Sequence, residues 1–160
     1  LQQQGQDGDV VALSVQNATV EASGRIILYG AGAFNSNLTA GKGVEAPRGV
    51  IRGGQVTVSE GDVTVKELGG PSAVHTSVSI LRRGRIAAQL VYPNVTIAIG
   101  GQKQAFSDGA RLLRARLGPD GRLVVEHLKA DFTRLRGFGP WTPENPEGSE
   151  ESKEGQARQP

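Results

Sequence analysis

The 160-residue sequence contains no cysteine and no methionine, and has only four Phe, two Tyr and one Trp. The absence of cysteine excludes disulfides, thiolate nucleophiles and cysteine-ligated metals. Nucleic-acid binding is not expected, because it relies on stacking aromatic residues and a dense basic stripe, and this chain has a net charge of only +2. No apolar run approaches the roughly 18 residues of a membrane-spanning helix. Any contact with a membrane is therefore expected to be peripheral.

Short alternating apolar runs, separated by glycine-containing turns, fill the stretch 38–66. Val56 and Val58 lie on one side of an extended segment, and the same alternation resumes after the turn at Gly61. A period of two residues is typical of β-strands with one buried face. With 23 glycines and many valines, the chain is predicted to be all-β, either a jelly roll or a stacked-rung β-roll of many short strands.

The composition divides the chain into three parts. Residues 1–9 are polar and are expected to form a flexible leader that remains after removal of a signal peptide before Leu1, which predicts a secreted, periplasmic or cell-envelope protein. Residues 10–137 form a single β domain. Residues 138–160 are rich in Pro and Glu and are predicted to be disordered. Trp141 either caps the open end of the β core or anchors another subunit.

Glycine, proline and polar clusters predict the connections between the strands. Residues 30–36 are expected to form a small-residue loop, and residues 102–109 a long polar surface loop. Arg82-Arg83-Gly84 is predicted to be a hairpin turn. Residues 118–121, Gly-Pro-Asp-Gly, are predicted to join two strands of the clearest hairpin in the chain, because they supply the restricted and positive φ angles of a tight turn.

The order of small and apolar residues within 38–66 resembles a known family. The positions that carry the resemblance are Leu38, Ala40, Val44, Gly49, Val50, Gly53, Val56, Val58, Gly61, Asp62, Val63 and Val65. They resemble the OstA-like domain of periplasmic lipopolysaccharide-transport proteins, the LptA and LptC type. The resemblance implies a non-enzymatic domain without cofactors, whose interior shelters the acyl chains of an amphiphile. The interior residues would then be Ile26, Leu28, Val56, Val58, Val63, Val65, Val78, Ile80, Ile97 and Ile99, which are equally suited to an ordinary packed core.

Arginines gather around two of the predicted turns. Arg82, Arg83 and Arg85 surround the first, and Arg114 and Arg116 precede the second. Guanidinium groups bind phosphate and carboxylate in a two-pronged geometry, so these five residues are candidate contacts for the anionic groups of a glycolipid or for a negative partner surface. The alternative is an ordinary solvated strand face.

Three Asn-x-Thr sequences begin at Asn17, Asn37 and Asn94, and each is a candidate glycosylation site. The same triplet also arises by chance in β-rich sequences. It has meaning as a modification site only in an organism that glycosylates secreted proteins.

The sequence lacks a catalytic or metal-binding signature. His75 and His127 are isolated on predicted strands, and no third ligand stands at a recognisable spacing. Glu45 and Glu67 could meet in the fold as a pair of acids, but carboxylates near turns are ordinarily solvated. We therefore expect no enzyme, no metal and no cofactor.

Two functions remain open from the sequence. The first is a cell-envelope binding or scaffold protein that shelters or bridges an anionic glycolipid such as lipopolysaccharide. The second is a structural subunit of an extracellular filament, surface layer or virion. In either case open edge strands would pair with like or related β domains, so a homo-oligomer is expected.

Overall fold

The computed structural model describes residues 8–130 and 132, and eleven strands lie within them. They are β1 (Val10–Gln16), β2 (Thr19–Ala22), β3 (Arg25–Ala40), β4 (Gly43–Val58), β5 (Asp62–Leu68), β6 (Thr76–Ile80), β7 (Ile86–Val91), β8 (Val95–Ile99), β9 (Gln102–Phe106), β10 (Ala110–Leu117) and β11 (Leu123–Leu128). Among these residues no helix is long and apolar enough to cross a membrane. The predicted tail 138–160, including Trp141, and most of the predicted leader lie outside the described residues.

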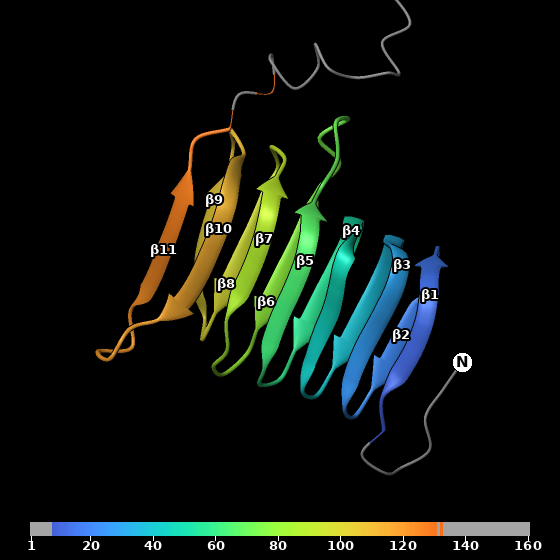
Figure 1. Ribbon diagram of the computed structural model, residues 1–160. Coiled ribbons are helices and arrows are strands. Elements are labelled where there is room, and N and C mark those ends of the chain that lie inside the picture. The colour runs from blue at the N-terminus through green and yellow to red at the C-terminus, as the bar shows by residue number, and fades with distance from the viewer. Residues whose placement is uncertain (1–7, 131, 133–160) are drawn as a thin grey trace, which may run out of the picture. The chain divides into compact units, whose positions relative to one another are not determined.

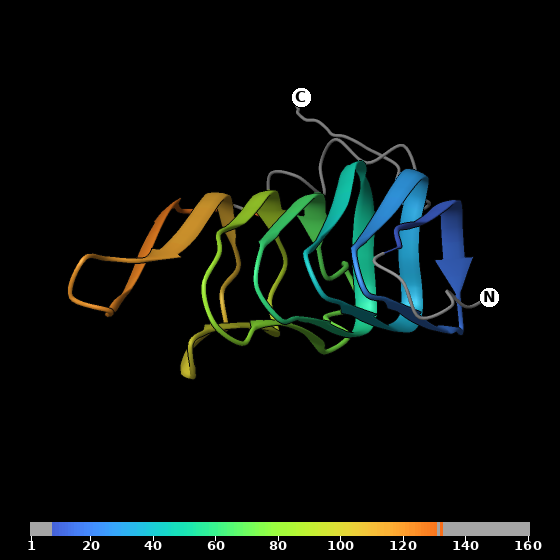
Figure 2. The same cartoon turned by 90° about the horizontal axis from the view of Figure 1, so that it is seen from below.

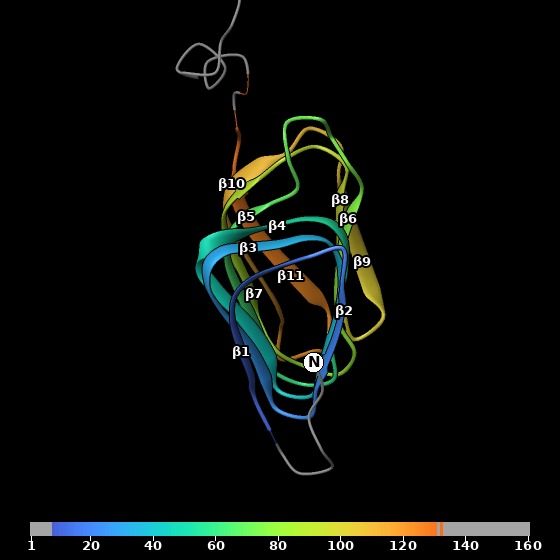
Figure 3. The same cartoon turned by 90° about the vertical axis from the view of Figure 1, so that its right-hand side faces the viewer.

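The chain winds as a coil in which each turn stacks on the one before (Figure 2). Ile26 pairs in parallel with Val44, Val44 with Val63, and Val63 with Ile86. Seen along the axis, successive turns trace the same flattened ring (Figure 3). The prediction of an all-β fold is confirmed, in its stacked-rung form: jelly rolls are built from antiparallel strands, whereas these rungs are parallel.

The coil has two layers (Figure 1). We call the layer formed by β1, the first parts of β3 and β4, β5, β7, β10 and β11 the front layer. The back layer comprises β2, the later parts of β3 and β4, β6, β8 and β9. β3 and β4 belong to both layers because each continues through the bend that joins them.

Alternation along each strand places apolar residues between the layers. On β5, Val63 and Val65 are buried, whereas Asp62, Thr64 and Lys66 are exposed. Because the rungs pair in register, equivalent positions stack into continuous apolar columns, and these form a single hydrophobic cluster.

The bend between the layers requires left-handed backbone at one position in most turns of the coil. Asn17, Asn35 and Asn94 occupy it with φ of 52°, 51° and 72°, and Gly53 with 81°. Asparagine tolerates this region better than other residues with a side chain. The predicted loop at 30–36 was wrong, because these residues lie within β3 and four of them, Gly32, Ala33, Phe34 and Ser36, pair with β4. Gly32 permits this, since a Cβ there would overlap the backbone of Val50.

Two other predicted connections were also wrong. Arg82–Gly84 does not join a hairpin, because β6 lies in the back layer and pairs with β4 and β8, while β7 lies in the front layer and pairs with β5 and β10. Strand alternation cannot distinguish pairing with the next strand from pairing with the next turn of the coil. Residues 102–106 of the predicted loop form β9, a polar strand at the edge of the back layer.

Antiparallel pairs close the last turn of the coil. β9 folds back on β8 and β11 folds back on β10, which confirms the predicted hairpin at 118–121. The ring of Phe106 on β9 meets the ring of His127 on β11 edge to face, with centroids 5.5 Å apart. Phe106 is buried at this end of the core. By contrast, β1 and β2 in the first turn pair only with β3 among the described strands.

Candidate anion-binding cleft

Two turns that are distant in sequence meet at one edge of the front layer and border an open hollow of about 740 Å³. One is the turn between β6 and β7, and the other joins β10 to β11. The hollow, which we call the arginine cleft, is lined by Asp62, Arg83, Gly84, Arg85, Arg116, Leu117, Gly118, Pro119 and Gly121. Three of the five predicted anion-contact arginines therefore line one cleft.

The first wall of the arginine cleft is fixed by hydrogen bonds to the start of β5. The carbonyl of Arg83 accepts the N–H of Gly61 at 3.0 Å, and the carbonyl of Arg85 accepts the N–H of Val63 at 2.8 Å. In return, the Arg85 N–H donates to Oδ1 of Asp62 at 2.9 Å. A side chain at Gly84 would overlap the carbonyl oxygen of Gly61. Glycine is therefore required here for the two turns of the coil to approach.

The second wall is a tight turn held in place by β9. The N–H of Gly118 donates to the carbonyl of Arg122 at 2.8 Å, and the N–H of Gly121 donates to the carbonyl of Gly118 at 2.9 Å. The side chain of Gln102 then bridges to the turn, donating to the carbonyl of Gly121 at 2.6 Å and accepting the N–H of Leu123 at 2.9 Å. Both walls are thus held by backbone hydrogen bonds and by the side chains of Asp62 and Gln102, and none of these contacts occupies an arginine side chain.

A second hollow of about 470 Å³ continues from the arginine cleft across the outer surface of the front layer. The two share Asp62, Arg85 and Arg116. Thr64 on β5 pairs with Ala87 on β7, and Ala87 pairs with Arg114 on β10, so short side chains lie between the charged ones. The second hollow is lined by Asp62, Val63, Thr64, Arg85, Ile86, Ala87, Arg114, Ala115, Arg116 and Glu126. Arg114, which lines this second hollow, is the fourth of the five predicted anion-contact arginines to lie at the site.

The arginines of the two hollows are available for a ligand. Within the described residues, the side chains of Arg83, Arg85, Arg114 and Arg116 make no hydrogen bond or ion pair. They face only two carboxylates across both hollows, those of Asp62 and Glu126. Four guanidinium groups against two carboxylates leave an excess of positive charge, which can hold a phosphate, sulfate or carboxylate group.

Arg82, the fifth predicted contact, lies outside both hollows. Its guanidinium is 3.9 Å from a carboxylate oxygen of Glu60, and its side chain is well exposed. An exposed pair at this distance contributes little to stability. Arg82 is adjacent to the first wall in sequence but is not placed to share a ligand with it.

Arg25 provides a contrast at the other end of the front layer. Its guanidinium contacts Asp9 at 3.2 Å and Glu45 at 3.0 Å. The N–H of Arg25 donates to Asp9 at 2.8 Å, and this bond, followed by the side-chain contact, lowers the pKa of Asp9. The bonds to Asp9 and Glu45 raise the pKa of Arg25. This arginine is engaged within the fold, unlike those of the cleft.

The residues predicted for a lipid-sheltering interior all lie in the core. They are Ile26, Leu28, Val56, Val58, Val63, Val65, Val78, Ile80, Ile97 and Ile99, each at most 3% exposed and each a member of the one hydrophobic cluster. Side chains from the front and back layers thus pack against one another. The interior serves as a packed core, and the hollows open on the outside.

Backbone geometry gives two of the three Asn-x-Thr asparagines a role in the fold. Asn17 and Asn94 have positive φ at the bend, and the Asn94 amide donates to the carbonyl of Ala73 at 2.9 Å. Asn37 is exposed on β3 and pairs with Gln55. The need for left-handed backbone explains the presence of asparagine at two of these three sites without any modification. Glycosylation at Asn17, Asn37 and Asn94 remains a prediction.

The candidate acids and histidines do not form a reactive group. Glu45 is paired with Arg25, and Glu67 lies 3.6 Å from Arg52. His75 precedes β6 instead of lying on a strand, and His127 contacts Phe106. Among the described residues no three His, Asp or Glu side chains are grouped as metal ligands.

No family model, curated protein or solved structure matches the chain. The resemblance to OstA-like domains therefore stays an expectation drawn from the sequence. The sequence identified the arginines of the cleft but not Asp62, nor Thr64 and Ala87 of the second hollow, because these residues join the arginines only through pairing between turns of the coil.

Proposed function

We propose that this chain is a non-enzymatic scaffold module that binds an anionic group of another molecule in the arginine cleft. The observation that carries the proposal is the convergence of Arg83 and Arg85, from the turn before β7, and Arg116, from the end of β10, on one cleft. Their side chains have no partner among the described residues. Placing several unpaired guanidinium groups together is unfavourable by itself. A bound anion compensates for this cost.

The cleft suits a group on a larger molecule. Its volume of about 740 Å³ falls within the usual range for a ligand site, but it is open to solvent and its walls are polar turns. Binding should therefore depend strongly on ionic strength. A phosphate or carboxylate on a glycolipid, as expected for a cell-envelope scaffold, has the required chemistry, and a secreted or periplasmic location remains part of this proposal.

The test uses pyrophosphate as a probe, titrated into the isotopically labelled full chain at low salt and followed by NMR. We expect shifts at Gly84, Arg85 and Gly118. Arg85→Ala/Arg116→Ala should weaken binding about 100-fold, because a hydrogen bond to a charged group contributes about 1.5 kcal/mol or more.

Arg48→Ala/Lys103→Ala removes the same charge from exposed positions outside both hollows and serves as the control. It should change the affinity less than twofold. Equal weakening by both double variants would show that only net charge matters, and the proposed site would be wrong.

A second function is favoured by the free edges of the coil. β1 and β2 at one end, and β9 and β11 at the other, each pair on one side only among the described strands. Such edges can add a strand from another copy, as a structural subunit of a filament or surface layer requires. Sedimentation velocity over a range of concentrations tests this: growth into long assemblies supports it, and a monomer at all concentrations contradicts it.

A further inference from the structure

We propose that the outer surface of the front layer is a membrane-binding face, which lies flat on a bilayer that contains anionic phospholipids. This inference rests on the proposed function, because the arginine cleft would take the lipid headgroups. It assigns the source of the anionic group and adds apolar contacts from neighbouring strands of the same layer.

The first observation is where the exposed large hydrophobic side chains lie. Five of six are on strands of the front layer, and the sixth, Leu81, is in the turn after β6. The five are Val11 (49% exposed), Leu13 (72%), Tyr29 (58%), Leu112 (50%) and Leu128 (46%). Scattered exposed hydrophobic side chains are common on protein surfaces, so the feature that carries weight here is their restriction to strands of one layer, the layer that also holds the unpaired arginines.

The pairing register places Val11 in the same outward row as Arg114, and the other four exposed hydrophobics lie on strands of the same layer. One outward row crosses the whole layer, from β1 to β11: Val11, Ile27, Glu45, Thr64, Ala87, Arg114 and Glu126. Neighbouring outward positions carry Tyr29 on β3 and Lys66 on β5. With strands about 4.8 Å apart, seven strands give a surface about 29 Å wide.

The arrangement of charge and apolar groups matches a bilayer surface. Val11, Leu13 and Tyr29 stand at one end of the layer, on β1 and β3, and Leu112 and Leu128 at the other, on β10 and β11. Arg114 and Arg116 share β10 with Leu112, and Arg85 directly precedes the neighbouring β7. Separate side chains of this size can enter the headgroup region, where tyrosine is enriched. The unpaired guanidinium groups then meet lipid phosphates, and each basic residue near an anionic surface adds to binding.

The back layer lacks both features. Its outward row is Thr19, Asn37, Gln55, Ser77 and Thr96, paired in register from β2 to β8. None of the six exposed large hydrophobics lies on a strand of the back layer. An acidic protein partner would account for the arginines of the front layer but not for its scattered exposed apolar side chains. A bilayer accounts for both, so the membrane is the favoured partner.

The experiment is co-sedimentation of the full chain with vesicles of phosphatidylcholine containing one third phosphatidylglycerol, and with pure phosphatidylcholine vesicles. We expect at least tenfold stronger partition to the anionic vesicles. Leu13→Ser/Tyr29→Ser should weaken partition about tenfold, and Arg85→Ala/Arg116→Ala by about as much. Thr39→Ala/Lys103→Ala, on the back layer, should change it less than threefold.

Circular dichroism checks that each variant folds. Absence of partition to anionic vesicles would overturn the inference, and so would partition that Leu13→Ser/Tyr29→Ser leaves unchanged. Pyrophosphate binding separates the two proposals. A chain that binds pyrophosphate in the cleft but not vesicles keeps the proposed function and loses the membrane, and a chain that binds neither loses both.

Discussion

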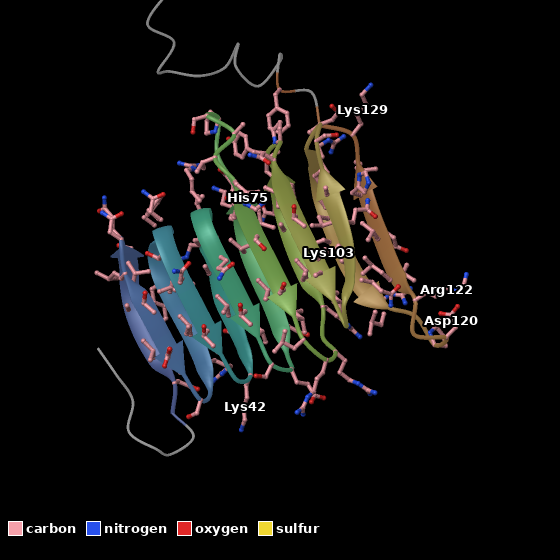
Figure 4. All side chains as sticks on the ribbon, turned by 180° about the vertical axis from the view of Figure 1, so that it is seen from behind. Lys42, His75, Lys103, Asp120, Arg122 and Lys129 are labelled. Atoms are coloured by element: carbon pink, nitrogen blue, oxygen red, sulfur yellow. The ribbon has the colours of Figure 1, made fainter. Side chains whose placement is uncertain are left out.

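The front and back layers are wound from the same chain around the same core, and they differ in what they present to solvent. Inward positions are alike in both: Val63 and Ile86 in front, Val78 and Ile97 behind, all fully buried. Outward, the back layer carries rows of Thr, Ser, Asn and Gln, and Lys103 on β9 is a rare cation there (Figure 4). The front layer carries arginines and exposed apolar side chains.

This difference separates the demands of folding from those of binding. A rung is stable when its inward residues pack and its backbone pairs, so any small polar residue suffices outside. The back layer meets that minimum. Unpaired arginines and half-exposed leucines on the front layer add nothing to rung stacking, and this is why the front layer is where a partner should bind.

The largest expected effect comes from damage to the core that both layers share. Ile97→Ala removes a fully buried side chain from the back layer and should lower the free energy of unfolding by about 2–5 kcal/mol. Thr39→Ala, on the outer surface of the same layer, should change it by less than about 0.5 kcal/mol. Urea denaturation measures both, and similar losses would mean that the Ile97 side chain does not pack in the core.

The bend that joins the layers gives the next effect. Asn94→Ala places alanine at a φ of 72° and removes the hydrogen bond from the side-chain amide to the carbonyl of Ala73. Together these changes should lower the free energy of unfolding by about 2 kcal/mol. Asn94→Gly keeps a residue that tolerates this φ and loses only the side-chain hydrogen bond, so the free energy of unfolding should fall less than in Asn94→Ala. If glycine proved as harmful as alanine in urea denaturation, the bend would not depend on left-handed backbone.

Removing a negative charge from the arginine cleft should have a smaller effect, and it should strengthen anion binding instead of weakening the protein. Asp62→Asn keeps an oxygen to accept the Arg85 N–H but removes the negative charge, so pyrophosphate should bind about fivefold more tightly at low salt. Asp108→Asn removes an exposed charge before β10, away from the cleft, and is the matched control. Calorimetric titration would contradict the cleft if the two variants behaved alike.

The smallest effect concerns the first turn of the coil. Folding lowers the pKa of Asp9 below its ordinary value of 3.8, chiefly through the bond from the Arg25 N–H, so its contribution to stability is complete above that value. It is lost as the pH falls through the folded-state pKa. Wild type should therefore exceed Asp9→Asn in stability near neutral pH, and the difference in urea denaturation should shrink in acid. If the difference in the free energy of unfolding did not change with pH, the ionised Asp9 carboxylate would not be the source of the stabilisation.

Alternation in the sequence was enough to predict the all-β class, the inward residues and the 118–121 hairpin, because each depends on neighbours a few residues apart. Alternation could not predict which residues pair between turns of the coil. Ile26 pairs with Val44, 18 residues later, whereas Val63 pairs with Ile86, 23 residues later, since residues 69–75 lengthen that turn. For the same reason the arginines were found, but Asp62, Thr64 and Ala87 were not placed beside them.

The short spacing between residues paired in neighbouring turns of the coil also has a consequence for how the protein forms. Partners lie 18 residues apart from β3 to β4 and 19 from β4 to β5, so closing each new turn of the coil brings together a segment of similar, modest length. Folding can then proceed as growth, each completed turn serving as the template for the next. A chain emerging from the ribosome could wind its first turns before β9 and β11, the strands that close the last turn, have been synthesised.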